Sequence, residues 1–306
     1  MAHRGAFIKE KGGKFCINVI CGPDEYTPLV DNNCYTNYLT RKHLRYSLET
    51  AELLKNKYPK KYARLKEKCG LTDAELLLWK RAADNMYLPY NQEYDMYMQD
   101  DQFMYRDPVD LDSLDPKRMP MLFHYHPLNL WRMQVCKQAD LVLLMFLCSN
   151  EFTTEMKKKI FDYMEPRTLH ESSLSAGIHA IVACDIGYGG EAYGFLKQAA
   201  RMDLDDYNGN TCNGAHAACM GSAWMMIVNG YAGLRIYDGK LHFKPITADG
   251  WQSYSFKLRF RGSIVRVEIS SEKARFELIE GGDVPIECGE NAFALSEKNR
   301  AVEIKL

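Results

Sequence analysis

The chain has 306 residues, 46% of them hydrophobic, and its 39 basic and 40 acidic side chains give a formal net charge of −1. This length and apolar content suffice for a large core and a smaller second domain, which excludes a disordered tail or a fibre. The balanced charge provides no broad positive field of the kind that non-specific nucleic-acid binding requires. We therefore expect no nucleic-acid partner.

Composition also bears on location and on metals. No apolar run is long enough to span a membrane, and no apolar stretch follows the first residues to form a signal peptide. The ten cysteines lie apart, none in the Cys-x-x-Cys spacing of a zinc or redox pair, which indicates buried thiols in a reducing compartment. His124 and His126 have no third ligand nearby and are interpreted as loop residues. We expect a cytoplasmic protein with no membrane partner and no metal.

The first half of the chain predicts one strand and then mainly helices. A β-favouring run over residues 14–21 predicts a short strand that delivers a loop at residues 22–26. The sequence Asp-Asn-Asn at residues 31–33 can cap a helix predicted from about residue 34 to 58. Residues 91–129, rich in Asp, Pro, Tyr and Met, are too long for a plain connection, so we expect a functional loop. Further helices are predicted at residues 73–87, 130–149, 153–165, 173–186, 189–200 and 213–231.

After residue 235 the pattern changes to alternation between apolar and polar residues. Strands are predicted at residues 241–243, 253–260, 264–269 and 274–278. The preceding consecutive helices suggest an α/α toroid, although they are too few for a closed ring of six helical hairpins. We therefore predict a mainly α fold, with a partial (α/α)6 barrel over residues 1–235 that lacks its N-terminal part. A C-terminal antiparallel β-sandwich follows over residues 236–306.

Glu25 is the first candidate for chemistry. It lies in the sequence Gly-Pro-Asp-Glu-Tyr, just past a strand and beside Asp24 and Tyr26. A like-charged neighbour and an aromatic wall are two ways to raise the pKa of a carboxyl group, as a general acid at neutral pH requires. On these five residues alone, a solvated acidic turn is the simpler interpretation.

Three more segments are candidates for binding. Residues 169–175 (Leu-His-Glu-Ser-Ser-Leu-Ser) directly precede an apolar helix, where hydroxyls and free N–H groups favour an anion, although an ordinary serine cap explains them equally well. Lys137 and Gln138 enter a predicted buried helix and should line something polar, unless Lys137 is a surface lysine. His216, in the first turn of a small-residue helix, could face a pocket, but a lone core histidine is the commoner case.

Taken together and in order, these motifs closely resemble glycoside hydrolase family 65, the family of maltose, trehalose, kojibiose and nigerose phosphorylases. The motifs are residues 22–26, 30–37, 137–140, 169–175 and 205–216. The resemblance begins near residue 20 and covers nearly the whole chain. It implies an (α/α)6 barrel that carries the active site and a C-terminal β-sandwich, with the N-terminal β domain and first barrel helices of relatives absent here.

The resemblance also implies roles for individual residues. Glu25 would be the proton donor, Lys137 and Gln138 would contact the substrate, and Ser172, Ser173 and His216 would hold phosphate. The expected reaction is inverting phosphorolysis of an α-linked glucose disaccharide to β-glucose 1-phosphate and a free sugar, with phosphate in place of the water and base of a hydrolase. Disaccharide and inorganic phosphate are the expected partners, no cofactor is expected, and a homodimer is left open.

The sequence departs from the family pattern at three places. Thr27 stands where relatives often have His, Ala176 where Pro is common, and residues 212–213 (Cys-Asn) replace a frequently acidic pair. Position 27 lies beside the acid and could touch the acceptor sugar, which leaves the acceptor and the linkage open, whereas the other two departures leave the phosphate hydroxyls untouched. Two alternative functions stay open: an α-glucoside hydrolase with Glu171 as its base, and a non-catalytic carbohydrate-binding fragment.

Overall fold

The computed structural model describes residues 2–306, which fold as two compact units. The first unit contains the chain up to residue 144 together with residues 166–169. The second contains residues 145–165 and 170–306. Within residues 2–306, no helix has both the length and the apolar character needed to cross a bilayer.

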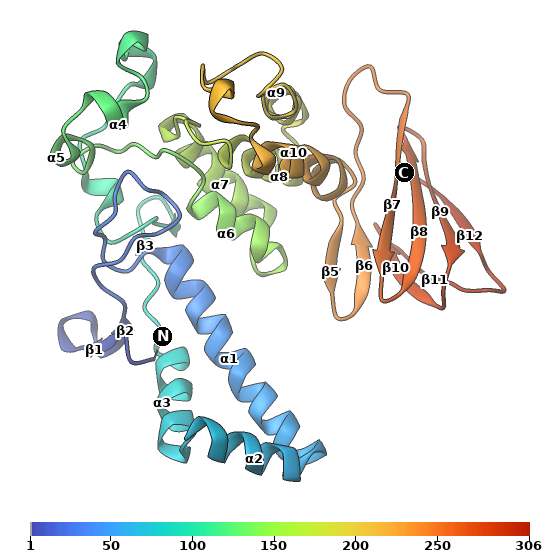
Figure 1. Cartoon of the computed structure of the whole chain (residues 1–306), viewed down its shortest axis with the longest axis horizontal. Helices are drawn as coiled ribbons and strands as arrows, with labels where there is room; N and C mark the ends of the chain where they lie inside the picture. The colour runs from blue at the N-terminus through green and yellow to red at the C-terminus, as the bar shows by residue number, and fades with distance from the viewer. Residues whose placement is uncertain (1) are drawn as a thin grey trace. The chain divides into compact units, whose positions relative to one another are not determined.

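The first unit opens with a small hairpin and three helices (Figure 1). Strand β1 (Ala6–Ile8) pairs antiparallel with β2 (Lys14–Cys16) around the 3-10 turn η1 (Lys9–Lys11). Helix α1 (Cys34–Lys57) begins as predicted, because the Asn33 side chain accepts a hydrogen bond from the Thr36 backbone N–H at 2.9 Å. Helices α2 (Pro59–Cys69) and α3 (Asp73–Asp84) follow, and both pack on α1.

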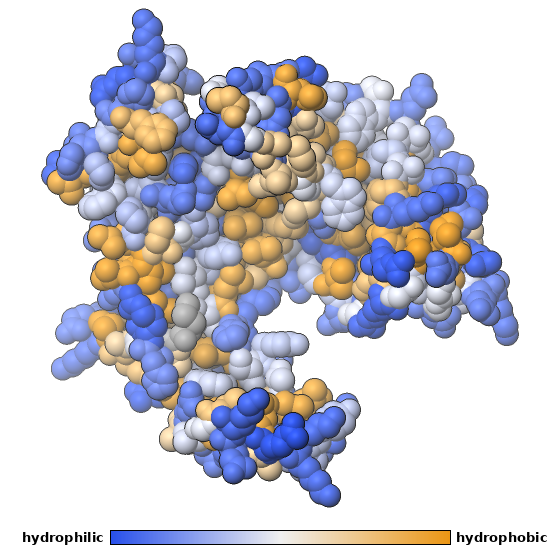
Figure 2. Space-filling model, viewed as in Figure 1, coloured by the Kyte–Doolittle hydropathy of each residue, from blue (hydrophilic) through white to orange (hydrophobic). Residues whose placement is uncertain are grey.

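Helix α2 was not predicted from the sequence. Basic residues dominate it and none of its residues is buried. Together with α1 and α3 it lines a largely apolar hollow of about 550 Å³. Figure 2 shows hydrophobic side chains among hydrophilic ones over α2.

The long segment after α3 is folded, with short elements that lie against the loop of Glu25. Tyr26 shares a core cluster with Met121, Leu130 and Val135, which belong to this segment or follow it. The segment therefore packs against the buried side of the loop that contains Glu25. Its elements are β3 (Tyr90–Asn91), β4 (Met96–Tyr97), η2 (Phe103–Tyr105), η3 (Leu111–Ser113), η4 (Pro116–Arg118), α4 (Met121–His124) and α5 (Pro127–Leu130).

The helix predicted over residues 130–149 is wrong over its first half. Only α6 (Leu141–Leu147) is a regular helix there. Before it, the Cys136 backbone N–H donates to the Arg167 carbonyl at 2.7 Å, and the Leu169 N–H donates to the Cys136 carbonyl at 2.9 Å. The backbone N–H and C=O groups of Cys136 are therefore hydrogen-bonded to a segment about 30 residues further along the chain and not within a helical turn. The local sequence does not indicate this pairing.

The second unit contains the remaining helices, whose prediction is confirmed. Helix α8 (Ser175–Ile186) is apolar on nearly all sides and packs against α7 (Thr154–Met164), α9 (Gly189–Ala200) and α10 (Ala217–Met225). Helix α10 continues as the π-helical turn η8 (Met226–Tyr231). Short 3-10 turns complete this part: η5 (Ser149–Glu151), η6 (Glu165–Arg167), which crosses into the first unit, and η7 (Thr211–Asn213).

The chain ends in two four-stranded sheets that share one core, as the β-sandwich prediction required. One sheet has the order β11-β10-β6-β5 and the other β12-β9-β8-β7. Phe243 of the first sheet and Phe276 of the second meet with ring centroids 5.0 Å apart. The strand pairs are antiparallel except for β6 and β10, which are parallel. The strands are β5 (Arg235–Tyr237), β6 (Lys240–Phe243), β7 (Ser253–Phe260), β8 (Ser263–Ser270), β9 (Lys273–Glu280), β10 (Val284–Cys288), β11 (Asn291–Leu295) and β12 (Ala301–Lys305).

All ten cysteines are free thiols. Seven are buried, as predicted, but Cys21, Cys69 and Cys212 are exposed. The exposed ones lie in a loop (Cys21), at the last turn of the exposed helix α2 (Cys69) and in η7 (Cys212).

Candidate functional site

The loop at residues 22–26, here called the acid loop, points Glu25 outward and its two neighbours inward. Asp24 and Tyr26 are buried, whereas 57% of the Glu25 side chain is exposed. The Glu25 carboxylate pairs with the Lys137 ammonium group at 2.5 Å. The expectation that Asp24 and Tyr26 surround the Glu25 carboxylate is therefore wrong, because both side chains point into the core of the first unit while Glu25 points to solvent.

Asp24 holds the acid loop from inside the first unit. Its carboxylate accepts hydrogen bonds from the Lys137 backbone N–H at 2.8 Å, the Thr27 hydroxyl at 3.1 Å and the Tyr26 backbone N–H at 3.3 Å. Burial raises the pKa of Asp24 to about 7, although these hydrogen bonds oppose the shift. The loop backbone is thereby tied to the segment that contains Lys137.

A second buried carboxylate lies under the same loop. Asp140 accepts from the Asp24 backbone N–H at 3.1 Å and from the Asn33 side-chain amide at 3.1 Å. Burial raises the pKa of Asp140 to about 8. Gly22 leaves room for these contacts, since a Cβ there would lie 2.4 Å from Asn33 Nδ2 and 2.6 Å from Asp140 Oδ2.

Lys137 and Gln138 lie in the irregular segment before α6, not in a helix. The Gln138 side chain is largely buried and donates to the Pro23 carbonyl at 2.6 Å. Both residues thus contact the acid loop, Lys137 through Glu25 and Gln138 through the backbone. The structure brings three of the predicted site residues together in the first unit: Glu25, Lys137 and Gln138.

Thr27 lies on the inner side of the acid loop and does not face solvent beside Glu25. It is buried, and its hydroxyl donates to Asp24. Its side chain therefore stabilises the buried side of the acid loop through Asp24 instead of reaching a sugar.

The paired serines lie in the turn before α8, in the second unit. His170 starts this turn with a left-handed backbone (φ +54°), and its Nδ1 lies 2.9 Å from the Ser175 hydroxyl. The Ser172 hydroxyl accepts a hydrogen bond from the Leu174 backbone N–H at 3.3 Å. The turn therefore sets the two hydroxyl-bearing residues just before the helix N-terminus.

His216 directly precedes α10 and is held by a carboxylate that the sequence motifs did not single out. Its Nδ1 lies 2.6 Å from Asp203 Oδ1, and its backbone N–H donates to Asp203 Oδ2 at 2.9 Å. Each of the two side chains is 18% exposed. The hydrogen bond from His216 holds the pKa of Asp203 below its usual value.

Helices α8 and α10 run parallel, with their N-termini at the same end. The Cys219 thiol donates to the Ser173 carbonyl at 3.2 Å, and further along a Cβ on Gly177 would lie 2.5 Å from Ser222 Cβ. The positive ends of two helix dipoles therefore meet at Ser173 and His216. This arrangement, with the serine hydroxyls beside the two helix N-termini, favours an anion.

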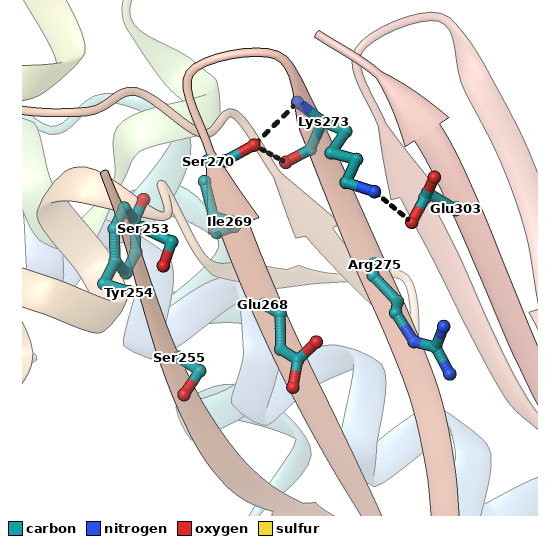
Figure 3. Close-up of a pocket in the computed structure, with 9 residues that line it drawn as sticks. All are labelled: Ser253, Tyr254, Ser255, Glu268, Ile269, Ser270, Lys273, Arg275 and Glu303. Carbon is teal, nitrogen blue, oxygen red and sulfur yellow. Dashed lines mark hydrogen bonds and ion pairs between the residues drawn. The ribbon is translucent and has the colours of Figure 1, made fainter. Parts of the chain in front are cut away.

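A separate polar hollow of about 440 Å³ lies on the sheet β12-β9-β8-β7 (Figure 3). Lys273 pairs with Glu303 at 3.0 Å, and Glu268 faces Arg275 across the strand pair. Its charges are thus largely balanced within the hollow. None of the predicted site residues lines it.

The chain is similar to known sugar-processing enzymes over nearly all of its length. Residues 2–225 match the glycosyl hydrolase family 65 central catalytic domain, and residues 234–295 match the C-terminal domain of that family. An α,α-trehalose phosphorylase from Thermoanaerobacter brockii is 47% identical over 282 residues, covering 92% of this chain and 36% of the relative. A maltose phosphorylase from Bacillus subtilis is 34% identical over 280 residues, covering 92% of this chain and 36% of the relative.

One solved structure, provisionally named a kojibiose phosphorylase from the human microbiome, superposes with a TM-score of 0.89 at 32% identity. It covers all of this chain, which in turn covers 41% of that protein. The chain thus spans about a third of the length of the curated relatives it matches.

Proposed function

The chain belongs to glycosyl hydrolase family 65, and on that premise we propose that it serves in the inverting phosphorolysis of an α-linked glucose disaccharide. Glu25 donates a proton to the departing glycosidic oxygen. Inorganic phosphate, held by Ser172, Ser173 and His216, attacks the anomeric carbon from the opposite face. The products are β-glucose 1-phosphate and a free sugar.

The observation that carries this proposal is the meeting of two parallel helix N-termini at Ser173 and His216 in the second unit. A hydrolase needs a carboxylate that activates water in place of such a cradle. The serine hydroxyls and the positive ends of the two helix dipoles instead supply donors and positive potential, which suit a phosphate dianion. This chemistry supports phosphate as the nucleophile.

The geometry of the acid loop supports Glu25 as the proton donor. Its carboxyl group is the exposed one of the two neighbouring carboxyls, whereas Asp24 is buried and fully engaged with the loop. A group that must touch the substrate has to be accessible. Lys137 pairs with the Glu25 carboxylate, and Gln138 donates to the Pro23 carbonyl. We therefore propose that both side chains contact the sugar on the same surface as Glu25.

We propose α,α-trehalose as the substrate. Two α,α-trehalose phosphorylases are 47% and 40% identical to this chain, whereas the maltose and kojibiose phosphorylases reach 34%. Phosphorolysis of trehalose would release one glucose together with β-glucose 1-phosphate. Maltose and kojibiose are the comparison substrates.

The decisive experiment incubates the complete gene product with each disaccharide, with and without inorganic phosphate, and follows sugar phosphate by ³¹P NMR. Trehalose should be consumed only when phosphate is present. The variant Glu25→Gln should lower the rate ~10²–10⁴-fold, as loss of positioned proton transfer does. Glu67→Gln, an exposed change on α2, is the matched control and should leave the rate unchanged.

Release of glucose at one rate with and without phosphate would overturn the proposal. Incorporation of oxygen from labelled water into the glucose would then identify a hydrolase, with Glu171 as the first base to replace. Consumption of maltose or kojibiose in place of trehalose would retain phosphorolysis and reject only the choice of sugar.

A further inference from the structure

Asp203 and His216 form a closed pair at the start of α10. One carboxylate oxygen bonds the ring nitrogen Nδ1 and the other bonds the backbone N–H of the same residue. Both the ring and the backbone of His216 are therefore fixed by a single partner. Within residues 2–306, no hydrogen bond is formed by the other ring nitrogen, Nε2.

An ionised carboxylate can only accept hydrogen bonds, so the hydrogen between Asp203 and His216 belongs to Nδ1. In a neutral imidazole the second nitrogen then carries a lone pair and acts as an acceptor. Carboxylates behind histidines set the tautomer of the ring in the same way at metal sites and in hydrolytic triads.

We infer that Asp203 is a positioning residue that leaves His216 Nε2 as a hydrogen-bond acceptor, and that this acceptor selects an anion carrying a hydroxyl group. The inference rests on the proposed phosphate site. The other groups of that site, two serine hydroxyls and two helix N-termini, can all donate to anionic oxygens. Because Nε2 can only accept while those groups can donate, the site matches hydrogen phosphate, which has one O–H group and several bare oxygens.

Sulfate provides the discriminating comparison. It has nearly the size and charge of hydrogen phosphate but no hydrogen to donate near neutral pH. Against a sulfate oxygen, the Nε2 lone pair is left unpaired and faces a like partial charge. Sites built to hydrogen-bond a substrate hydroxyl reject analogues that lack it, because a polar group of the site then has no partner.

The test measures binding of inorganic phosphate and of sulfate to the complete gene product by titration calorimetry, without turnover. The unaltered protein should prefer phosphate by ~10-fold or more, as one lost hydrogen bond predicts. Asp203→Asn should tighten sulfate binding ~10-fold and bring the preference close to unity, because its amide can donate to Nδ1 and move the ring proton to Nε2, which then donates to a bare oxygen of either anion. Asp205→Asn is the matched control, since Asp205 pairs with Arg201 and not with His216.

A second readout is the ¹⁵N spectrum of the labelled histidine rings. His216 should show a protonated Nδ1 in the unaltered protein and a protonated Nε2 in Asp203→Asn. If that variant does not fold, His216→Ala, which retains Asp203 and the backbone N–H, should remove the preference for phosphate. Equal binding of phosphate and sulfate by the unaltered protein, or an unprotonated Nδ1, would overturn the inference.

The outcomes separate this inference from the proposed function. A preference for phosphate without phosphorolysis would reject the proposed reaction and retain the role of Asp203. Phosphorolysis together with equal binding of sulfate would retain the reaction and reject the role of Asp203.

Discussion

The carboxylate of Asp24 accepts a hydrogen bond from the backbone N–H of Lys137 at 2.8 Å, while the side chain of Lys137 pairs with Glu25. The buried Asp24 thus holds the backbone of Lys137. The ammonium group of the same lysine contacts Glu25, the exposed neighbour of Asp24. The two segments are 113 positions apart in the sequence. The direction of the Glu25 side chain therefore depends on the buried hydrogen bonds of Asp24.

Replacing Asp24 with Ala should destabilise the first unit. The change leaves the Lys137 N–H and the Thr27 hydroxyl without their buried acceptor, and each unsatisfied buried group costs about 1–3 kcal/mol. We expect a loss of about 2–5 kcal/mol in the free energy of unfolding, measured by urea denaturation. Asp84→Ala is the control, because the Asp84 pair with Lys80 is exposed and should contribute little. A loss for Asp24→Ala no larger than for Asp84→Ala would contradict this account.

Stability should fall as the pH rises from about 4 to 8. Burial raises the pKa of Asp24 to about 7 and that of Asp140 to about 8, both above the ordinary value of 3.8. Between pH 3.8 and these raised pKa values, the folded state therefore binds more protons than the unfolded state. The contribution of the two carboxyl groups to the free energy of unfolding is complete below pH 4 and is lost above pH 8.

The variant Asp140→Asn cannot titrate but keeps an oxygen for the Asp24 N–H and the Asn33 amide. Its stability relative to the unaltered protein should therefore increase by about 1–3 kcal/mol between pH 6 and pH 9. Urea denaturation at four pH values measures this difference. A difference that stays constant over that range would mean that Asp140 ionises as it does in water.

The helices that could be predicted from the sequence are those whose apolar spacing is strong. Helix α1 has its Asn33 cap and a repeating apolar stripe, and α8 is apolar throughout, so local pattern and tertiary packing agree. The strands β7, β8 and β9 alternate clearly between buried and exposed residues. These elements were identified without any knowledge of their partners.

Features that depend on distant partners could not be predicted. Lys137 and Gln138 were assigned to a helix because apolar residues follow them, but Cys136 pairs with Arg167 and Leu169 instead. Asp140 was visible only as the end of a motif, and nothing in the local sequence indicates that it accepts from Asp24. Asp203 lies 13 positions before His216 and outside any motif, so only the fold of the turn after α9 identifies it.

Replacing Gly22 with Ala should distort the acid loop. The new Cβ would lie 2.4 Å from Asn33 Nδ2 and 2.6 Å from Asp140 Oδ2, so the loop or the Asp140 side chain must move. Overpacking of this kind costs about 1–3 kcal/mol, and we expect a larger relative loss of kcat, since Glu25 lies three residues on. Gly194→Ala is the control, because its Cβ meets nothing within 4 Å and α9 should gain up to about 1 kcal/mol. Urea denaturation and phosphorolysis rates are measured for both variants. Equal stabilities and equal rates would mean that a Cβ at position 22 is not crowded.

Replacing Asp185 with Ala should destabilise the second unit more than any exposed charge change there. At the end of α8, Asp185 accepts hydrogen bonds from Lys157 of α7 at 2.8 Å and from Arg235 of β5 at 2.9 and 3.0 Å. The three side chains are at most 12% exposed, so removal of the carboxylate leaves two buried cations facing each other. Breaking a buried ion pair in this way costs about 3–5 kcal/mol. Glu155→Ala removes an exposed pair with Lys159 on α7 and should cost about 0.5 kcal/mol or less. Thermal denaturation measures the Tm of both variants. Equal Tm values would mean that the Asp185 cluster is solvated and that packing alone joins α7 and α8 to β5.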